Sequence, residues 1–332
     1  MFGIFRTALA TFVVLEHLGT APYLGTYAVF GFYILSGYLM TRIMQKTYGY
    51  TLRGLGKYFT NRFLRIYPIY WVSILLSFFL IYLTSEELTR SVNTYLYYPT
   101  SSIDFLSNVF ITFTPDSEPR LTPPAWALTT ELFFYILIAL GISKNIKLTA
   151  LWLLASLFYT IYLVYVNASF SYRYFTISAA SLPFSIGAMI FFVQQKFRIK
   201  KPLNLSLAIT TIIFLNYLLN LNYQTSHTYG FYFNLTLCAL LIFCLTEVKP
   251  NYIRIDKSIG NLSYPIYLIH YQCGIIAFQL LYLFDLKYNK GDFIFFTTSI
   301  IITLILAYII STTVEQKIET IRNKIRPSSK IT

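Results

Sequence analysis

The chain has 332 residues, of which 56% are hydrophobic and only 12% charged, and its mean hydropathy is +0.58. This composition excludes an ordinary soluble domain and indicates an all-α polytopic membrane protein, organised as one domain over residues 1–332. The formal net charge of +13 would suit a nucleic-acid-binding protein. A strongly apolar chain carries such charge at its membrane boundaries instead, so we expect no nucleic-acid partner.

The first predicted span, residues 4–20, is an apolar run that contains Arg6, Glu16 and His17. Arg6 and His17 lie within roughly 20° of one helix face and about 16 Å apart along it. Either Arg6 is an interfacial anchor and His17 a snorkelling side chain, or both line a polar channel in which His17 acts as a base. Glu16 points about 100° away from His17, so we expect it to contact another helix.

The second predicted span, residues 26–44, contains the pair Ser36–Gly37, and small residues of this kind let a helix or a ligand approach closely. Arg62 and Arg65 precede the third predicted span, residues 67–83, and share one helix face. They suit either anchoring to lipid headgroups or bidentate binding of a phosphate.

A long connection, about residues 84–122, follows on the predicted outer side. Connections of this length usually contain structure of their own, and this one is placed to cap an external cavity. The fourth predicted span, residues 124–142, contains Trp126 near its start and carries Glu131 about two turns in. Glu131 is therefore expected at the depth of His17, where it either approaches His17 or pairs with another buried polar group.

Six further spans are predicted, and the ninth begins near Tyr264 and places His270 near mid-membrane, as a packing residue or a functional one. The three cysteines lie in apolar runs and are expected to be buried small hydrophobic residues; we expect no metal site. A short basic tail, about residues 315–332, ends the chain. These six spans cover residues 148–166, 177–193, 203–221, 231–248, 262–284 and 293–314.

The distribution of positive charge sets the predicted orientation. With the N-terminus in the cytoplasm, 21 of the 26 Lys and Arg residues fall in segments on the inner side. Such a bias predicts an even number of spans, about ten, with both termini cytoplasmic.

Taken together, these stretches resemble the membrane-bound acyltransferase-3 family across nearly the whole chain. The family shows Arg, ten residues, then His; an aromatic segment ending in Ser-Gly; an Arg-rich entry to the third span; Pro-x-Trp-Ser-Leu-x-x-Glu; and Ser-Tyr-x-x-Tyr-Leu-x-His. Two departures are Ala127 in place of the usual Ser and the absence of Gly-Val-Asp before the Ser-Gly segment. The matching positions are Arg6 and His17; Phe32 to Gly37; Arg62 to Pro68; Pro124, Trp126, Leu128 and Glu131; and Ser263, Tyr264, Tyr267, Leu268 and His270.

The resemblance implies transfer of an acyl group, commonly acetyl, from cytoplasmic acetyl-CoA or another acyl-CoA to a sugar hydroxyl. The acceptor would be a cell-surface polysaccharide or lipid-linked glycan, and the protein would lie in a bacterial inner membrane with no permanently bound cofactor. The residue roles implied are catalysis by His17, Glu131 and Arg6, donor binding by Arg6, Arg62, Arg65 and Ser36, and substrate binding by Trp126, Tyr264 and His270. The alternative class is a transporter or flippase of a lipid-linked sugar, which would also require charges within the membrane.

Overall fold

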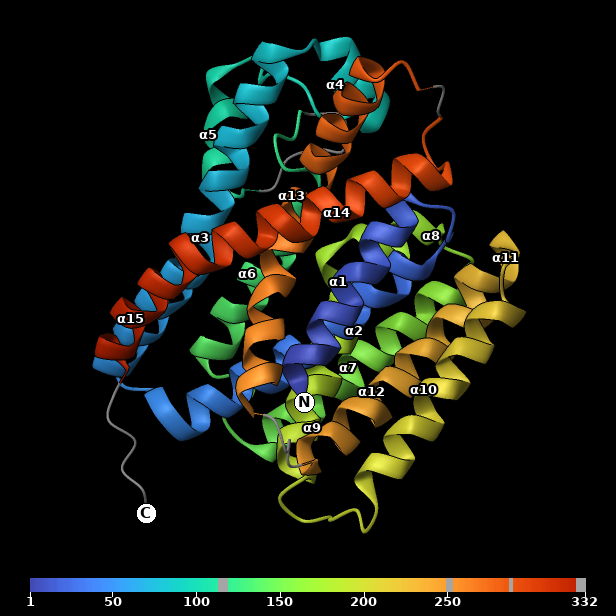
Figure 1. Ribbon diagram of the computed structural model, residues 1–332. Helices are drawn as coiled ribbons and strands as arrows, with labels where there is room; N and C mark the ends of the chain where they lie inside the picture. The colour runs from blue at the N-terminus through green and yellow to red at the C-terminus, as the bar shows by residue number, and fades with distance from the viewer. Residues whose placement is uncertain (113–118, 249–252, 287–288, 327–332) are drawn as a thin grey trace.

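The computed structural model describes residues 1–112, 119–248, 253–286 and 289–326, and in these residues the regular secondary structure is helical (Figure 1). Predicted features at 113–118, 249–252, 287–288 and 327–332 lie outside the described residues, among them part of the outer connection, the end of the tail, and Lys249, Lys287 and Lys330. The α-helices are α1 (Phe2–Leu18), α2 (Leu24–Ile43), α3 (Leu52–Leu83), α4 (Glu86–Val92), α5 (Ser102–Phe110), α6 (Trp126–Leu140), α7 (Ile146–Tyr165), α8 (Phe170–Phe175), α9 (Ile177–Val193), α10 (Pro202–Leu219), α11 (Tyr223–Thr225), α12 (Phe231–Glu247), α13 (Ile253–Leu283), α14 (Phe293–Ile310) and α15 (Gln316–Ile325).

Each of the ten predicted spans coincides with a helix, which confirms the prediction of an all-helical polytopic membrane protein. Eight helical stretches in the described residues are long and apolar enough to cross a membrane, and α1 and α9 are 17 residues each. Several helices extend beyond the predicted spans. Helix α3 begins at Leu52, fifteen residues before the predicted start, and α14 continues through a π-helical turn (Ser311–Glu315) into α15.

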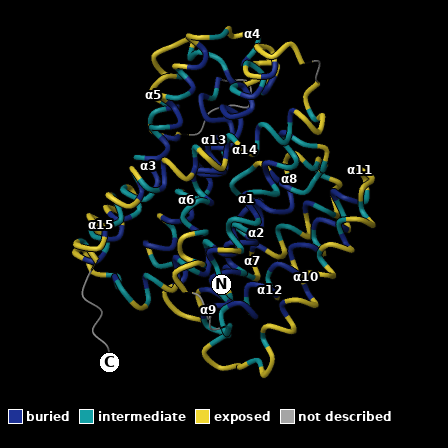
Figure 2. Tube along the Cα trace, in the orientation of Figure 1, coloured by how far each residue is buried: buried dark blue, intermediate teal, exposed yellow. Residues whose placement is uncertain are grey.

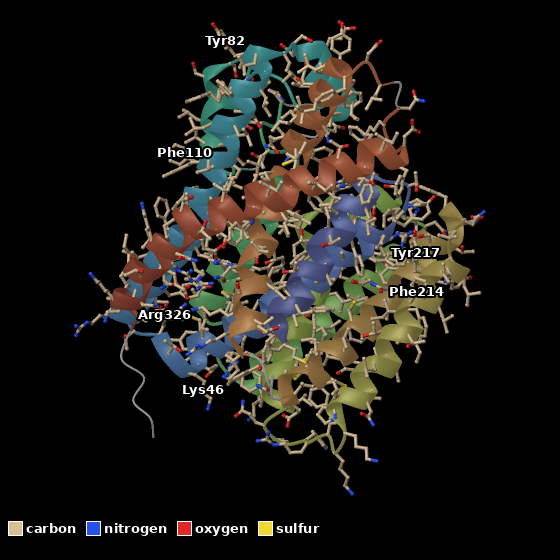
Figure 3. All side chains as sticks on the ribbon, viewed as in Figure 1. Lys46, Tyr82, Phe110, Phe214, Tyr217 and Arg326 are labelled. Carbon is tan, nitrogen blue, oxygen red and sulfur yellow. The ribbon has the colours of Figure 1, made fainter. Side chains whose placement is uncertain are left out.

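The helices differ in how much of their surface faces the protein. Burial is extensive on α2 and α13, whereas α7 and α10 keep large apolar side chains exposed, such as Leu151, Phe158 and Phe214 (Figure 2). Exposed apolar side chains around a buried centre are what a lipid environment permits. The labelled side chains of Lys46 and Arg326 lie at the opposite end of the molecule from those of Tyr82 and Phe110 (Figure 3).

Glycines allow the central helices to approach closely. A Cβ at Gly37 would lie 2.2 Å from the carbonyl oxygen of Phe184, and one at Gly187 would lie 1.9 Å from that of Ile34. Helices α2 and α9 therefore pack backbone against backbone, as small residues allow in membranes. Asp256 joins α1 to α13 in the same region, because its carboxylate accepts hydrogen bonds from the backbone N–H groups of Gly3 and Ile4 at 3.2 and 3.0 Å.

The outer connection contains structure of its own, as its length predicts. Ser101 and Asp104 form a capping box at the start of α5. The buried Asn108 side chain donates to the carbonyl oxygens of Asp104 and Pro119, both at 2.9 Å, and accepts from the N–H of Leu121 at 2.8 Å. One amide thus ties α5 to the segment that leads into α6.

Proline interrupts two of the long helices. Pro68 lies within α3 and Pro265 within α13. A proline inside a helix has no N–H to donate to the carbonyl four residues earlier, so each helix lacks one backbone hydrogen bond. Both positions are within three residues of side chains that line the central cavity, namely Arg65 and Tyr264.

Candidate functional site

A cavity of about 130 Å³ lies among five helices, α1, α2, α3, α6 and α13. Six of the residues predicted for the site share it, although they come from distant parts of the sequence: Arg6, Ser36, Arg62, Arg65, Glu131 and Tyr264. The other lining residues are Val29, Phe32, Tyr33, Leu35, Leu39, Met40, Ile66, Ala127, Leu128, Tyr135, Ser263 and Tyr267.

Three arginines make the cavity cationic. The Nε atoms of Arg6 and Arg62 are buried and have no hydrogen-bond partner among the described residues. Arg62 does donate from its terminal nitrogen to Asn61 Oδ1 at 3.0 Å. A buried donor without a partner is costly, so these guanidinium groups favour an anionic or strongly accepting ligand.

Arg65 is held by residues outside the predicted set. It forms an ion pair with Glu315, a buried side chain just before α15, and its guanidinium lies 5.9 Å from the ring centre of Tyr264. Asn61 also accepts two hydrogen bonds from Arg322 of α15, at 3.2 and 3.1 Å. The C-terminal helix therefore fixes the positions of two of the cavity arginines.

Glu131 faces the cavity from α6. Ser36 Oγ donates to its Oε1 at 2.5 Å, and the hydroxyl of Tyr135, one turn further along α6, donates to the same oxygen. The structure thus gives Glu131 partners other than His17. Glu131, Ser36 and Tyr135 form a polar group that positions the carboxylate in the cavity.

His17 lies apart from this cavity, against His270. The Nδ1 atom of His17 is 2.9 Å from Nε2 of His270, and the two rings are stacked with centres 5.1 Å apart. Neither imidazole is among the residues that line the arginine cavity. The expected channel shared by Arg6 and His17 is therefore interrupted in the described structure, at a wall to which Tyr267 contributes.

Tyr267 connects the two places. Its side chain lines the cavity and donates to the carbonyl oxygen of Pro124 at 2.9 Å, while its own carbonyl oxygen is 2.8 Å from Nδ1 of His270. The ring of Phe32 packs edge-on against it, with centres 5.9 Å apart. The histidine pair is thus about one helical turn beyond the edge of the cavity.

The remaining predicted residues have these places. Trp126 packs against Tyr174 and Phe175, with ring centres 5.3 and 4.7 Å apart, and it does not line the cavity. Tyr264 lines the cavity and donates to the carbonyl oxygen of Ile66 at 2.9 Å. Glu16 accepts two hydrogen bonds from Thr26 at the start of α2, which confirms that it contacts another helix.

Sequence reasoning missed several site residues. Tyr135 stands four residues after Glu131, so the helical spacing of i and i+4 would have revealed it. Asn61 directly precedes Arg62 in α3 and binds it locally, whereas Glu315 and Arg322 reach Arg65 and Asn61 only through tertiary packing against α3, for which the sequence contains no local signal.

Comparisons with known proteins identify the family of the chain. A family model described as an acyltransferase domain matches residues 2–312. An uncharacterized protein of Aquifex aeolicus (strain VF5) is 29% identical over 227 residues, which are 66% of this chain and 97% of that protein. No solved structure matches the chain.

The fold and the cationic cavity define a polytopic membrane protein that keeps charged side chains in its interior. The family match over nearly the whole chain narrows the class of membrane protein to one family. The chain belongs to the acyltransferase-3 family and is a multi-pass membrane acyltransferase.

Proposed function

We propose that the protein is an O-acyltransferase that takes an acyl group, such as acetyl, from a cytoplasmic acyl-CoA and transfers it to a sugar hydroxyl. The acceptor would be a cell-surface polysaccharide or a lipid-linked glycan, in a bacterial inner membrane. The observation that carries the donor assignment is the pair of buried Nε atoms on Arg6 and Arg62 that lack partners at the cavity. Phosphate and thioester oxygens are acceptors that would satisfy them.

Charge and size favour a donor that enters in an extended form. Three arginines and one carboxylate line the cavity, and Glu315 already neutralises Arg65. A cavity of about 130 Å³ is too small for a whole coenzyme, but it suits the narrow end of one. In the proposal the phosphates remain near Arg6 of α1 and Arg62 of α3, and the acyl thioester points toward His17.

His17 is the proposed general base. Its Nε2 takes the proton of the acceptor hydroxyl as that oxygen bonds to the thioester carbonyl carbon. The C–S bond then breaks, and the imidazolium returns the proton to the departing sulfur, which leaves as a thiol. Because Tyr267 lines the cavity and its backbone carbonyl contacts His270, the boundary that it forms has to open during each turnover.

The test is release of free thiol from acetyl-CoA by the purified protein in lipid nanodiscs, with and without glycan acceptor. His17→Ala should abolish release, and Arg6→Gln should raise the KM for acetyl-CoA. Mass spectrometry of surface glycans from cells with and without the protein would identify the acyl mass and the acceptor. Thiol release by His17→Ala at the wild-type rate would overturn the assignment, as would sugar movement across the bilayer without thiol release.

A further inference from the structure

Two contacts in series link His17, His270 and the backbone carbonyl oxygen of Tyr267. The carbonyl oxygen of Tyr267 lies 2.8 Å from Nδ1 of His270, and Nε2 of His270 lies 2.9 Å from Nδ1 of His17. A carbonyl oxygen can only accept a hydrogen bond. His270 must therefore carry a proton on Nδ1.

Neutral imidazole has one protonated nitrogen, so with the proton on Nδ1 the Nε2 atom of His270 is an acceptor. His17 must then donate through its own Nδ1, which leaves Nε2 of His17 without a proton. The contacts thus define one tautomer for each ring.

The surroundings favour the neutral form of both rings. His270 is fully buried, and the adjacent carboxylate of Glu16 is already bound to Thr26. No ion pair joins a carboxylate to either imidazole in the residues that the structure describes. A buried imidazolium without a counter-charge is costly, so a protonated pair is disfavoured.

We propose that His270 is a positioning residue that fixes the tautomer of His17, so that Nε2 of His17 is the atom that accepts the proton of the acceptor hydroxyl. His270 thereby acts through His17 and does not touch the sugar. This inference rests on the proposed function and replaces the substrate-binding role implied for His270. The backbone carbonyl of Tyr267 takes the orienting part that a carboxylate takes in a Ser-His-Asp triad.

The pair also joins α1 to α13, so a purely structural role has to be distinguished from tautomer control. A phenylalanine at 270 keeps an aromatic ring against Tyr271, whose centre lies 4.5 Å from that of His270, but provides no acceptor. A glutamine at 270 provides an oxygen that can accept from Nδ1 of His17. If packing alone matters, the aromatic replacement should be the milder of the two.

The experiment is ¹⁵N NMR of the full chain, labelled at histidine and reconstituted in nanodiscs without substrate. The chain has three histidines, and a His227→Asn variant identifies the signal of the third. We expect Nδ1 of His17 to be protonated and Nε2 bare in the wild type and in His270→Gln. In His270→Phe the proton should move largely to Nε2.

Kinetics of the same proteins provide the second measurement. His270→Phe should lower kcat at least about 100-fold and change the KM for acetyl-CoA less than about twofold. The kcat of His270→Gln should be at least about tenfold higher than that of His270→Phe. A wild-type spectrum with Nε2 of His17 protonated would overturn the inference, even if a variant failed to fold. So would full activity in His270→Phe. A bare Nε2 in a wild-type protein that releases no thiol would instead overturn the proposed function and leave the tautomer assignment intact.

Discussion

The ion pair between Arg65 and Glu315 gives the most quantitative prediction. Both side chains are buried, with 18% and 3% of their surface exposed, and the second oxygen of Glu315 has no partner among the described residues. Glu315→Ala would leave Arg65 without its counter-charge. Two further arginines, Arg62 and Arg322, are bound to the neighbouring Asn61 and would add to the repulsion.

The expected cost follows from the burial. Breaking a buried pair by removing one partner destabilises a protein by about 3–5 kcal/mol, because an uncompensated charge remains. At about 2–4 °C per kcal/mol, the Tm should fall by roughly 6–20 °C. Replacing both partners, in Arg65→Met with Glu315→Met, removes the charge as well and should recover most of this loss, while donor binding remains impaired.

The same part of the chain offers a matched control. Glu319 lies four residues further on and pairs with Lys257 at 2.8 Å, with 21% and 60% of the two side chains exposed. Pairs of this exposure contribute about 0–1 kcal/mol, so Glu319→Gln should change the Tm by less than about 4 °C. The measurement is thermal unfolding in one detergent, followed by intrinsic fluorescence. Equal shifts for Glu315→Ala and Glu319→Gln, or a double variant as unstable as the single one, would refute the reasoning.

Three other changes have defined outcomes. Gly187→Ala would place a Cβ 1.9 Å from a backbone oxygen of α2, so the yield of folded protein, measured by size-exclusion chromatography, should fall greatly. The control is Gly56→Ala, where the added Cβ would have nothing within 4 Å, and which should be neutral or stabilising by up to about 1 kcal/mol. Asn108→Ala removes three hydrogen bonds and should cost about 2–4 kcal/mol, seen as faster proteolysis of the connection between α5 and α6; unchanged cleavage would contradict it. Glu131→Gln keeps an acceptor for Ser36 but removes one negative charge from the cavity, so KM for acetyl-CoA should fall while kcat falls also, and an unchanged kcat would argue against a role in the reaction.

The sequence was sufficient for the helices and for much of the cavity. Apolar run length predicted ten segments, and each of them coincides with a helix of the described structure, since a bilayer demands a continuous apolar helix. Arg6 was identified because charge inside a span is costly, and Arg62 and Arg65 because they share one helix face at the entry to a span; all three line the cavity. Counting turns from the start of its span put Glu131 well inside α6, but its partner Ser36 on α2 depends on how the helices rotate against one another.

The histidine pair was beyond the reach of sequence reasoning. His17 and His270 are 253 residues apart, and their contact depends on the packing of α1 against α13. That packing is set by close backbone contacts such as the one between Gly3 and Gly260, which no periodicity in either helix predicts. The same holds for Glu315, because the sequence pattern placed it at the start of a basic tail, whereas in the structure it lies on a continuous helical stretch.

Pro68 and Pro265 mark the points at which two helices around the cavity, α3 and α13, bend most easily. Each leaves one main-chain carbonyl of α3 or α13 without its usual donor, so bending at these points requires less work than elsewhere along the same helices. These two helices carry Arg65 and His270, whereas α2 makes close backbone contacts with α9 at Gly37 and Gly187. Longer acyl chains would therefore be accommodated by tilting of α3 and α13. The ease with which these two helices bend, more than the volume of the cavity, would then set the range of acyl chain lengths that the protein accepts.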